Sequence, residues 1–141
     1  MNLSKANIKK IMIQWAGAWN RHDLNEVMKL FHEDVVFENW SDARVKGKGA
    51  LQKAWTPWFE NHGDFQFILE DLIIDDDEQK VVWLWCLEWP SLERGYEGKP
   101  ERRRGLDIIH FRDGKIIEKY TYSKTTIEID HKRVRLFAAT S

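Results

Sequence analysis

The chain has 141 residues and a net charge of -1 at pH 7, from 22 lysines and arginines and 23 aspartates and glutamates. This length suits one domain with a single core over residues 1–141, and the charge balance argues against a nucleic-acid partner. A single cysteine excludes an internal disulfide, and we see no membrane-span stretch and no signal peptide, so we expect a cytoplasmic protein without a membrane partner.

Two amphipathic helices are predicted at the start of the chain. Residues 5–20 show the i, i+3, i+4, i+7 spacing of apolar side chains, and Ser4 is suited to cap their first turn. Asp23 can cap a second helix, whose apolar side extends to Phe31. The apolar positions of the first helix are Ile8, Ile11, Met12, Trp15 and Trp19.

A strand and a third helix follow. Alternation over residues 34–40 indicates a strand with Phe37 and Asn39 on one side and Trp40 on the other. The next helix opens at Gly47 and Gly49 and ends at Gly63-Asp64, and Pro57 is expected to kink or interrupt it. Its apolar face carries Leu51, Ala54, Trp55, Trp58 and Phe59.

The second half of the chain is predicted to be antiparallel strands. Residues 65–74, 81–89 and the two arms of a hairpin over 104–123 are rich in β-branched and aromatic residues, and residues 126–129 suggest a short extra strand. Trp83, Trp85, Leu87 and Trp89 share one face of their strand. Helices early and strands late make an α+β fold, a curved antiparallel sheet with three helices packed on its concave face.

Asp107 is the residue that most suggests a functional site. A carboxylate in the middle of an apolar strand is costly unless it is paired, protonated or facing a polar cavity. A two-residue hairpin loop would place Asp107 opposite Tyr120, whereas a three-residue loop with a bulge would place it opposite Lys119, with Thr121 on the same face. The residues alone leave both registers open.

Two blocks of sequence, HDLNEVMKLFHEDVVFENW (His22–Trp40) and GLDIIHFRDGKIIEKYTY (Gly105–Tyr122), carry a resemblance that covers nearly the whole chain. The chain resembles the nuclear transport factor 2-like superfamily, which includes ketosteroid isomerase and the SnoaL-like polyketide cyclases. The resemblance implies a cone-like α+β fold and a homodimer that forms through the outer face of the sheet. It also favours the three-residue hairpin loop, with Lys119 opposite Asp107. Activity does not follow, because this superfamily contains enzymes and non-enzymes.

The resemblance to ketosteroid isomerase is partial at the site itself. Its general base falls on Asn39, which cannot accept a proton at neutral pH, and its tyrosine donor falls on Trp15. Only its oxyanion-hole aspartic acid is retained, at Asp107. The last-strand carboxylate of the related epoxide hydrolases falls on Thr121. A steroid isomerase of the usual mechanism is therefore not expected.

We expect a cavity for a small, largely apolar ring compound, with Asp107 as the catalytic residue. An alternative is that Asp107 and Lys119 form a buried ion pair that only fixes strand register. The protein would then be a non-catalytic binding protein or a dimeric interaction module. No metal or cofactor is expected, because His22 and His32 lack metal-ligand spacing. The predicted ligand-binding residues are Trp15, Trp19, Phe37, Asn39, Trp55, Trp83, Trp85 and Lys119.

Overall fold

A computed structural model describes residues 1–136 of the chain. Its helices are α1 (Lys5–Asn20), α2 (Leu24–Met28) and α3 (Lys48–Glu60). Its strands are β1 (Phe31–Glu38), β2 (Arg44–Lys46), β3 (Gln66–Asp75), β4 (Lys80–Pro90), β5 (Pro100–Arg112), β6 (Lys115–Ser123), β7 (Thr126–Ile129) and β8 (Lys132–Arg135). Within these residues no helix is both long and apolar enough to cross a membrane.

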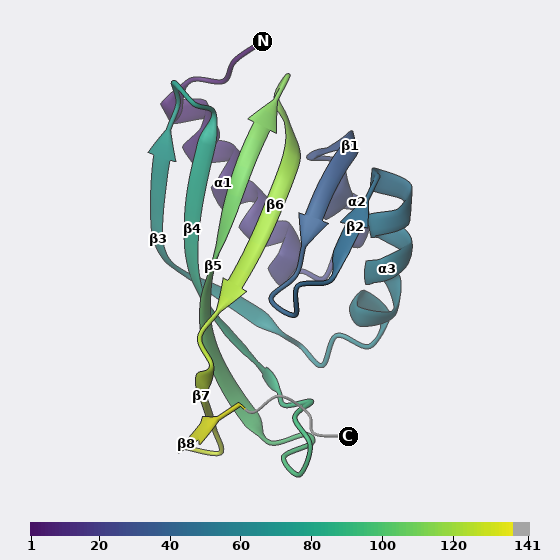
Figure 1. Ribbon diagram of the computed structural model, residues 1–141, viewed down its shortest axis with the longest axis vertical. Coiled ribbons are helices and arrows are strands. Elements are labelled where there is room, and N and C mark those ends of the chain that lie inside the picture. Colours follow the sequence, from purple (N-terminus) through teal and green to yellow (C-terminus); the bar gives the residue numbers. More distant parts are fainter. Residues whose placement is uncertain (137–141) are drawn as a thin grey trace.

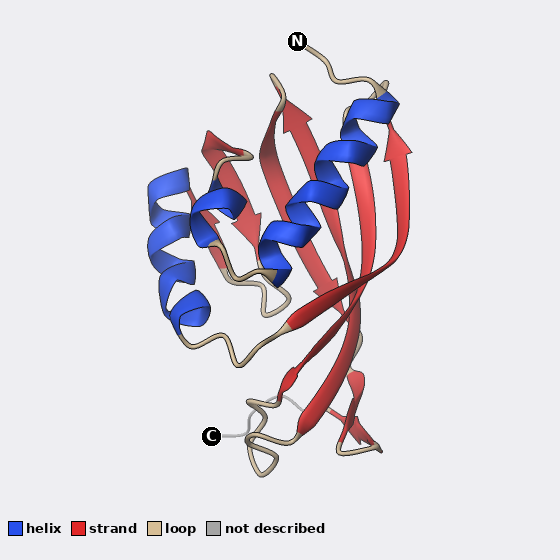
Figure 2. Cartoon of the chain, turned by 180° about the vertical axis from the view of Figure 1, so that it is seen from behind, coloured by secondary structure: helices blue, strands red, loops and turns tan. Residues whose placement is uncertain are grey.

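All the strands belong to one strongly curled sheet, in the order β2-β1-β6-β5-β4-β3, with β7 beside β5 and β8 beside β7 (Figure 1). The three helices cover one face of it, and α1 runs obliquely across the long strands (Figure 2). The α+β class and the helix-covered, curled sheet are therefore confirmed. The sheet is mixed rather than wholly antiparallel, because β1 lies parallel to β6.

The two N-terminal helices begin where the caps predict. Ser4 accepts a hydrogen bond from the backbone N–H of Asn7, and Asp23 accepts one from that of Glu26. The second helix is shorter than its apolar pattern suggests, since it ends at Met28 and Phe31 starts β1. Phe31 is 1% exposed, so burial in the core explains its apolar character without a longer helix.

Neither predicted register of the β5–β6 hairpin is correct. The loop has two residues, Asp113 and Gly114, and both have positive φ, as a type I′ turn requires. A bulge lies one step further along, because Phe111 pairs with Ile116 but His110 pairs with Glu118. Together the short turn and the bulge place Asp107 opposite Thr121.

Other element boundaries differ from the pattern in small ways. Pro57 lies inside α3, which continues to Glu60 without interruption. The extra strand at Thr126–Ile129 is confirmed as β7, whereas β2 and β8, of three and four residues, are not predicted because they are too short to show alternation. The tail of the chain at 137–141 lies outside the described residues.

Strand β5 positions the site because one of its faces carries charged side chains toward the interior. Glu101, Arg103, Gly105 and Asp107 alternate along that face, and the three that carry a side chain are at most 4% exposed. Gly105 pairs with Trp85 of β4, and a Cβ atom on Gly105 would lie 2.6 Å from the Trp85 ring. The missing side chain therefore lets the indole lie directly against the strand.

Candidate functional site

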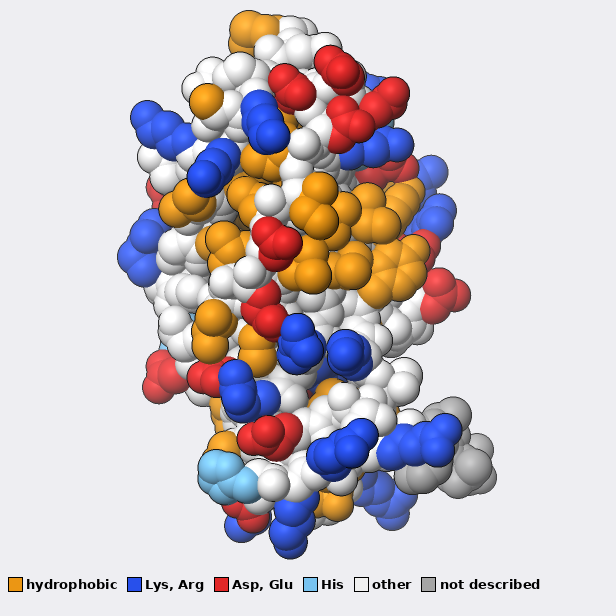
Figure 3. Space-filling model, turned by 90° about the vertical axis from the view of Figure 1, so that its left-hand side faces the viewer, with side chains coloured by type: hydrophobic (Ala, Val, Ile, Leu, Met, Phe, Trp, Pro, Cys, Tyr) orange, Lys and Arg blue, Asp and Glu red, His pale blue; other side chains and the backbone are white. Residues whose placement is uncertain are grey.

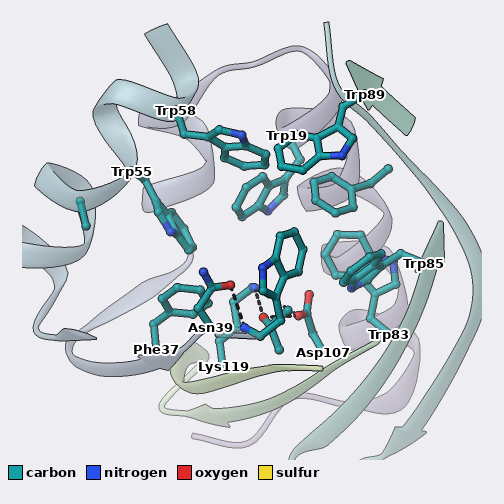
Figure 4. Close-up of a pocket in the computed structure, with 14 residues that line it drawn as sticks. Trp19, Phe37, Asn39, Trp55, Trp58, Trp83, Trp85, Trp89, Asp107 and Lys119 are labelled. Carbon is teal, nitrogen blue, oxygen red and sulfur yellow. Dashed lines mark hydrogen bonds and ion pairs between the residues drawn. The ribbon is translucent and has the colours of Figure 1, made fainter. Parts of the chain in front are cut away.

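A cavity of about 280 Å³ lies between α1, α3 and the concave face of the sheet (Figure 4). Its buried floor includes Asp107, Lys119 and Thr121, while Trp40, Trp58 and other partly exposed residues form its mouth. Its volume is close to the lower bound of about 300 Å³ for ligand pockets, so it suits a small molecule. The lining residues are Trp19, Phe37, Asn39, Trp40, Ala54, Trp55, Trp58, Phe67, Trp83, Trp85, Trp89, Asp107, Lys119 and Thr121.

The structure brings together all the residues that the sequence assigned to the cavity, except Trp15. The indole N–H of Trp15 donates to the backbone oxygen of Val27 at 3.0 Å, and its ring packs against Phe31 and Trp83. Trp15 is therefore a core residue with its polar atom satisfied. It faces the interior as predicted, but Trp19, one helical turn further along α1, occupies the cavity wall instead.

Three polar side chains on the floor form a closed set of hydrogen bonds. Thr121 Oγ1 donates to Asp107 Oδ1 at 2.6 Å, and Lys119 Nζ donates to Asp107 Oδ1 at 3.2 Å and to Thr121 Oγ1 at 2.9 Å. The bulge brings Lys119 and Thr121 to the face of Asp107. Within residues 1–136 the second carboxylate oxygen, Oδ2, accepts no hydrogen bond, and Figure 4 shows it turned toward the cavity.

Lys119 lies in a box of aromatic rings. Its Nζ is 4.8 Å from the ring centre of Phe37 and 5.7 Å from those of Trp19 and Trp55. These rings offer their negative faces to a cation, but the side chain is only 5% exposed. Burial lowers the pKa of Lys119 from its ordinary value, and the Asp107 carboxylate opposes that shift. The floor thus holds an amine and a carboxylate between which a proton can move.

The walls combine an apolar surface with unused donors. The indole N–H groups of Trp19, Trp83 and Trp85 are buried and have no hydrogen-bond partner within the described part of the chain. Leaving a buried donor unpaired costs about 1–3 kcal/mol. All three side chains line the cavity, and with their N–H groups buried they present mainly apolar ring surface to it.

A second buried cluster lies behind the mouth and was not predicted. The Glu101 carboxylate accepts hydrogen bonds from Trp89 Nε1, from Ser91 Oγ at 3.0 Å, and from Arg103 Nε and Nη2 at 3.1 and 3.3 Å. Trp89 lines the cavity. The cluster therefore fixes part of the mouth.

The same cluster contacts Trp40, which also lines the mouth of the cavity. The sequence analysis placed Trp40 on the side of the strand opposite Phe37 and Asn39, and that prediction is wrong. The guanidinium carbon of Arg103 lies 4.7 Å from the Trp40 ring centre, and Arg103 also donates to Glu93 at 2.8 Å. Strand β1 ends at Glu38, so Trp40 sits in a turn where strand alternation no longer applies. The sequence did contain a signal for this cluster. Glu101 and Arg103 lie an even number of residues before Asp107, so on one strand all three side chains point to the same face.

One group of side chains has the composition of a metal site. Ligand atoms of His22, His62 and Asp64 lie within 4.8 Å of one another. The two imidazole rings, however, are stacked with centres 3.7 Å apart and planes 7° apart. Ring nitrogens present their lone pairs in the ring plane, so parallel stacked rings do not converge on one ion. His22 Nε2 is also within 2.8 Å of the Phe65 carbonyl oxygen.

Comparison with known families gives one clear match. A family model described as the SnoaL-like domain matches residues 12–119, which include part of α1, all of α2 and α3, strands β1 to β5 and the floor of the cavity up to Lys119. No curated protein matches the chain. The family match therefore comes without a characterised relative from which an activity could be carried over.

Solved structures show the same fold at low identity. AclR, a proposed hydroxylase from Streptomyces galilaeus, has a TM-score of 0.70 at 21% identity, over 86% of this chain and 81% of its own. SalBIII, an epoxide hydrolase/cyclase-like enzyme of pyran ring formation in salinomycin, has 0.69 at 15%, over 82% and 89%. A proposed ketosteroid isomerase from Kribbella flavida has 0.64 at 17%, over 82% and 76%. These identities support the fold and not a shared activity.

Proposed function

The chain belongs to the SnoaL-like domain family, within the nuclear transport factor 2-like superfamily, and from this we propose that it binds a small, largely apolar ring compound and acts on it by acid–base chemistry at Asp107. The observation that carries the proposal is the single unsatisfied carboxylate oxygen of Asp107 at the floor of an aromatic cavity. Solved neighbours described as cyclase-like and isomerase-like are consistent with ring substrates.

The chemistry follows from the positions of the polar atoms. Oδ2 of Asp107 faces the ligand space and can accept a proton from carbon or oxygen of a bound ring compound. Lys119 lines the cavity and can donate to a ligand oxygen on which negative charge develops. Asn39 lines the mouth and accepts a hydrogen bond from the Trp40 backbone at 2.9 Å, so it serves orientation rather than proton transfer.

Replacement of one atom group tests the proposal. Asp107→Asn keeps the shape of the side chain and removes its charge, so we expect binding or turnover of fused-ring ketones and phenols to fall sharply while the fold is retained. Quenching of tryptophan fluorescence measures binding, and thermal melts measure stability. Asp113→Asn, an exposed carboxylate on the same hairpin, is the control. A large loss of stability with unchanged binding would assign Asp107 to strand register alone.

We further propose that the protein is a homodimer through the outer face of the sheet, opposite the helices. Two cross-strand rows of apolar side chains cover that face, and Figure 3 shows hydrophobic residues gathered over the β3 side of the molecule. An uncovered apolar face of several strands is typical of an interface. The rows are Ile73–Val82–Ile108–Tyr120 and Leu84–Leu106–Tyr122.

A charge in the centre of these rows tests the assembly. Tyr122 is 51% exposed, and Tyr122→Glu would place a carboxylate against a partner's apolar face. We expect light scattering to report a dimer for the natural chain at micromolar concentration and a monomer for the variant. Leu92→Glu, at another exposed apolar position away from the rows, is the control and leaves the mass unchanged. A monomeric natural chain overturns the proposal.

For location we propose the reducing cytoplasm. The observation is Cys86, the single cysteine, which is unpaired and 4% exposed. Burial raises the pKa of its thiol above the ordinary value, which disfavours the reactive thiolate. A fold that carries no disulfide gains nothing from an oxidising compartment. Fractionation of the native host, with detection of the chain by antibody, would locate it directly.

A further inference from the structure

Lys119 differs from every other lysine in residues 1–136, because it is the one that is buried. It lines the cavity, and its ammonium has two hydrogen-bond partners, Asp107 and Thr121, for three protons. The remaining direction is bounded by the rings of Phe37, Trp19 and Trp55 rather than by water. Apolar residues in place of the whole Asp107–Lys119 pair would often leave stability unchanged, so packing alone does not require a lysine and a carboxylate here.

We propose that Lys119 is a nucleophilic amine, and that it forms an imine with a small aldehyde or ketone bound against the aromatic walls. The inference rests on the proposed binding function of the cavity and specifies the chemical class of its ligand. A carbonyl group on a flat ring compound suits the site, since the ring can pack against the aromatic walls and the carbonyl carbon is open to an amine.

The adjacent carboxylate makes the step possible at near-neutral pH. Burial lowers the pKa of Lys119, and Asp107, 3.2 Å away, can take one ammonium proton to leave the free amine. Nitrogen then attacks the carbonyl carbon, and a proton moves from nitrogen to the former carbonyl oxygen to give a carbinolamine. Asp107 returns its proton to that hydroxyl group, which leaves as water. The products are a protonated imine, one water molecule and an ionised Asp107.

Trapping with a reductant tests the inference. Purified protein is incubated with 2-naphthaldehyde and sodium cyanoborohydride at pH 7.5, and the modified lysine is located by intact mass and peptide mapping. Because a lowered pKa increases the free-amine fraction, we expect Lys119 to be modified at least about tenfold faster than exposed lysines such as Lys53. Lys119→Arg keeps a cation at the site but cannot form the imine, so its modification should fall to the surface background.

The outcomes separate this inference from the proposed function. If 2-naphthaldehyde quenches tryptophan fluorescence but Lys119 is labelled no faster than Lys53, binding stands and the imine is excluded. If the aldehyde neither quenches nor labels, both proposals fall. In a folded Asp107→Asn variant, checked by near-UV circular dichroism, Lys119 should be labelled severalfold more slowly at aldehyde concentrations that saturate the fluorescence quenching. Equal labelling rates in that variant would remove Asp107 from the step.

Discussion

Two buried ion pairs lie on the inner face of the sheet, one within β5 and one between β5 and β6, and they differ in how completely their charges are satisfied. The side chains of Glu101 and Arg103 are 0% and 4% exposed, and those of Asp107 and Lys119 are 4% and 6% exposed. Both oxygens of Glu101 accept hydrogen bonds. In the other pair only one oxygen of Asp107 does so, within the described residues, and the pair lines a cavity.

When two carboxylates are equally buried, the hydrogen bonds to their oxygens distinguish one with a structural role from one that is free to contact a ligand. A buried carboxylate with all its lone pairs directed at fixed donors has nothing left to offer a ligand. One with a free oxygen in a cavity keeps a position for a substrate proton. Gly105 lies between the two pairs, and the Trp85 ring against it separates them. One strand therefore supports the mouth at one end and, at the other, carries the carboxylate to which we assign the proposed chemistry.

The largest expected effect comes from the satisfied pair. Glu101→Gln removes the negative charge that compensates Arg103. It also replaces one carboxylate oxygen by an NH2 group, which would face the N–H and O–H donors around it. We expect a loss of about 3–5 kcal/mol in the free energy of unfolding, measured by urea denaturation. Glu88→Gln, at the exposed pair with Arg102, is the matched control and should change stability little. If both variants unfold alike, the hydrogen bonds of the buried Glu101 carboxylate do not contribute to stability as proposed.

The next effect in size comes from the residue between the pairs. A Cβ atom at position 105 would lie 2.3 Å from the backbone oxygen of Tyr122 and 2.6 Å from the Trp85 ring. Gly105→Ala should therefore cost about 3 kcal/mol, since the backbone oxygen cannot move aside without shifting β6. The displaced indole should also alter near-UV circular dichroism. Gly49→Ala lies in helix α3, where a Cβ atom meets nothing within 4 Å, so it should leave near-UV circular dichroism unchanged and cause no loss of stability.

The contrast between the pairs also marks what the sequence could predict. Alternation along an apolar strand is enough to place Asp107, Trp83 and Trp85 on the inward face, because side-chain parity follows from local geometry. The pairing partner of Asp107 is not local. It depends on a bulge at Ile117, where two successive isoleucines are both buried, and apolar side chains alone do not say which of them is the extra residue.

Contacts between segments far apart in the sequence account for the other features that the sequence did not predict. The parallel pairing of β1 with β6 joins residues far apart in sequence, and no turn signal encodes it. Trp40 reaches the cavity from a turn, and Arg103 reaches Trp40 across the sheet. The family resemblance supplied the cone-like fold, but its hairpin register fails here. The hydrophobic pattern of the sequence thus predicts the helices, the strands and which side chains face inward. The partners of a buried charge can be assigned only from the tertiary structure.

A smaller effect is expected when Asp107 and Lys119 lose the Thr121 hydroxyl, to which both are hydrogen-bonded. Thr121→Val keeps the volume of the side chain and removes the hydroxyl that bonds both Asp107 and Lys119. We expect a loss of about 2 kcal/mol in unfolding free energy, because the carboxylate and ammonium still face one another. Thr121→Ser retains the hydroxyl and should recover most of this loss. A Ser variant as unstable as the Val variant would attribute the effect to packing.

The smallest effect is a pH dependence that only the pair of Asp107 and Lys119 should show. Burial lowers the pKa of Lys119 in the folded state, whereas in the unfolded chain it returns to about 10.5. Between those two values the unfolded state binds more protons than the folded state, so the contribution of Lys119 to stability rises as pH rises. The stability of the natural chain minus that of Lys119→Met should therefore increase on going from neutral pH toward 10.5. The same difference taken with Lys53→Met should stay flat, because that side chain is exposed in both states. A Lys119 difference that falls with pH would mean that attraction to Asp107 outweighs burial, so that the amine stays protonated and the proposed imine cannot form.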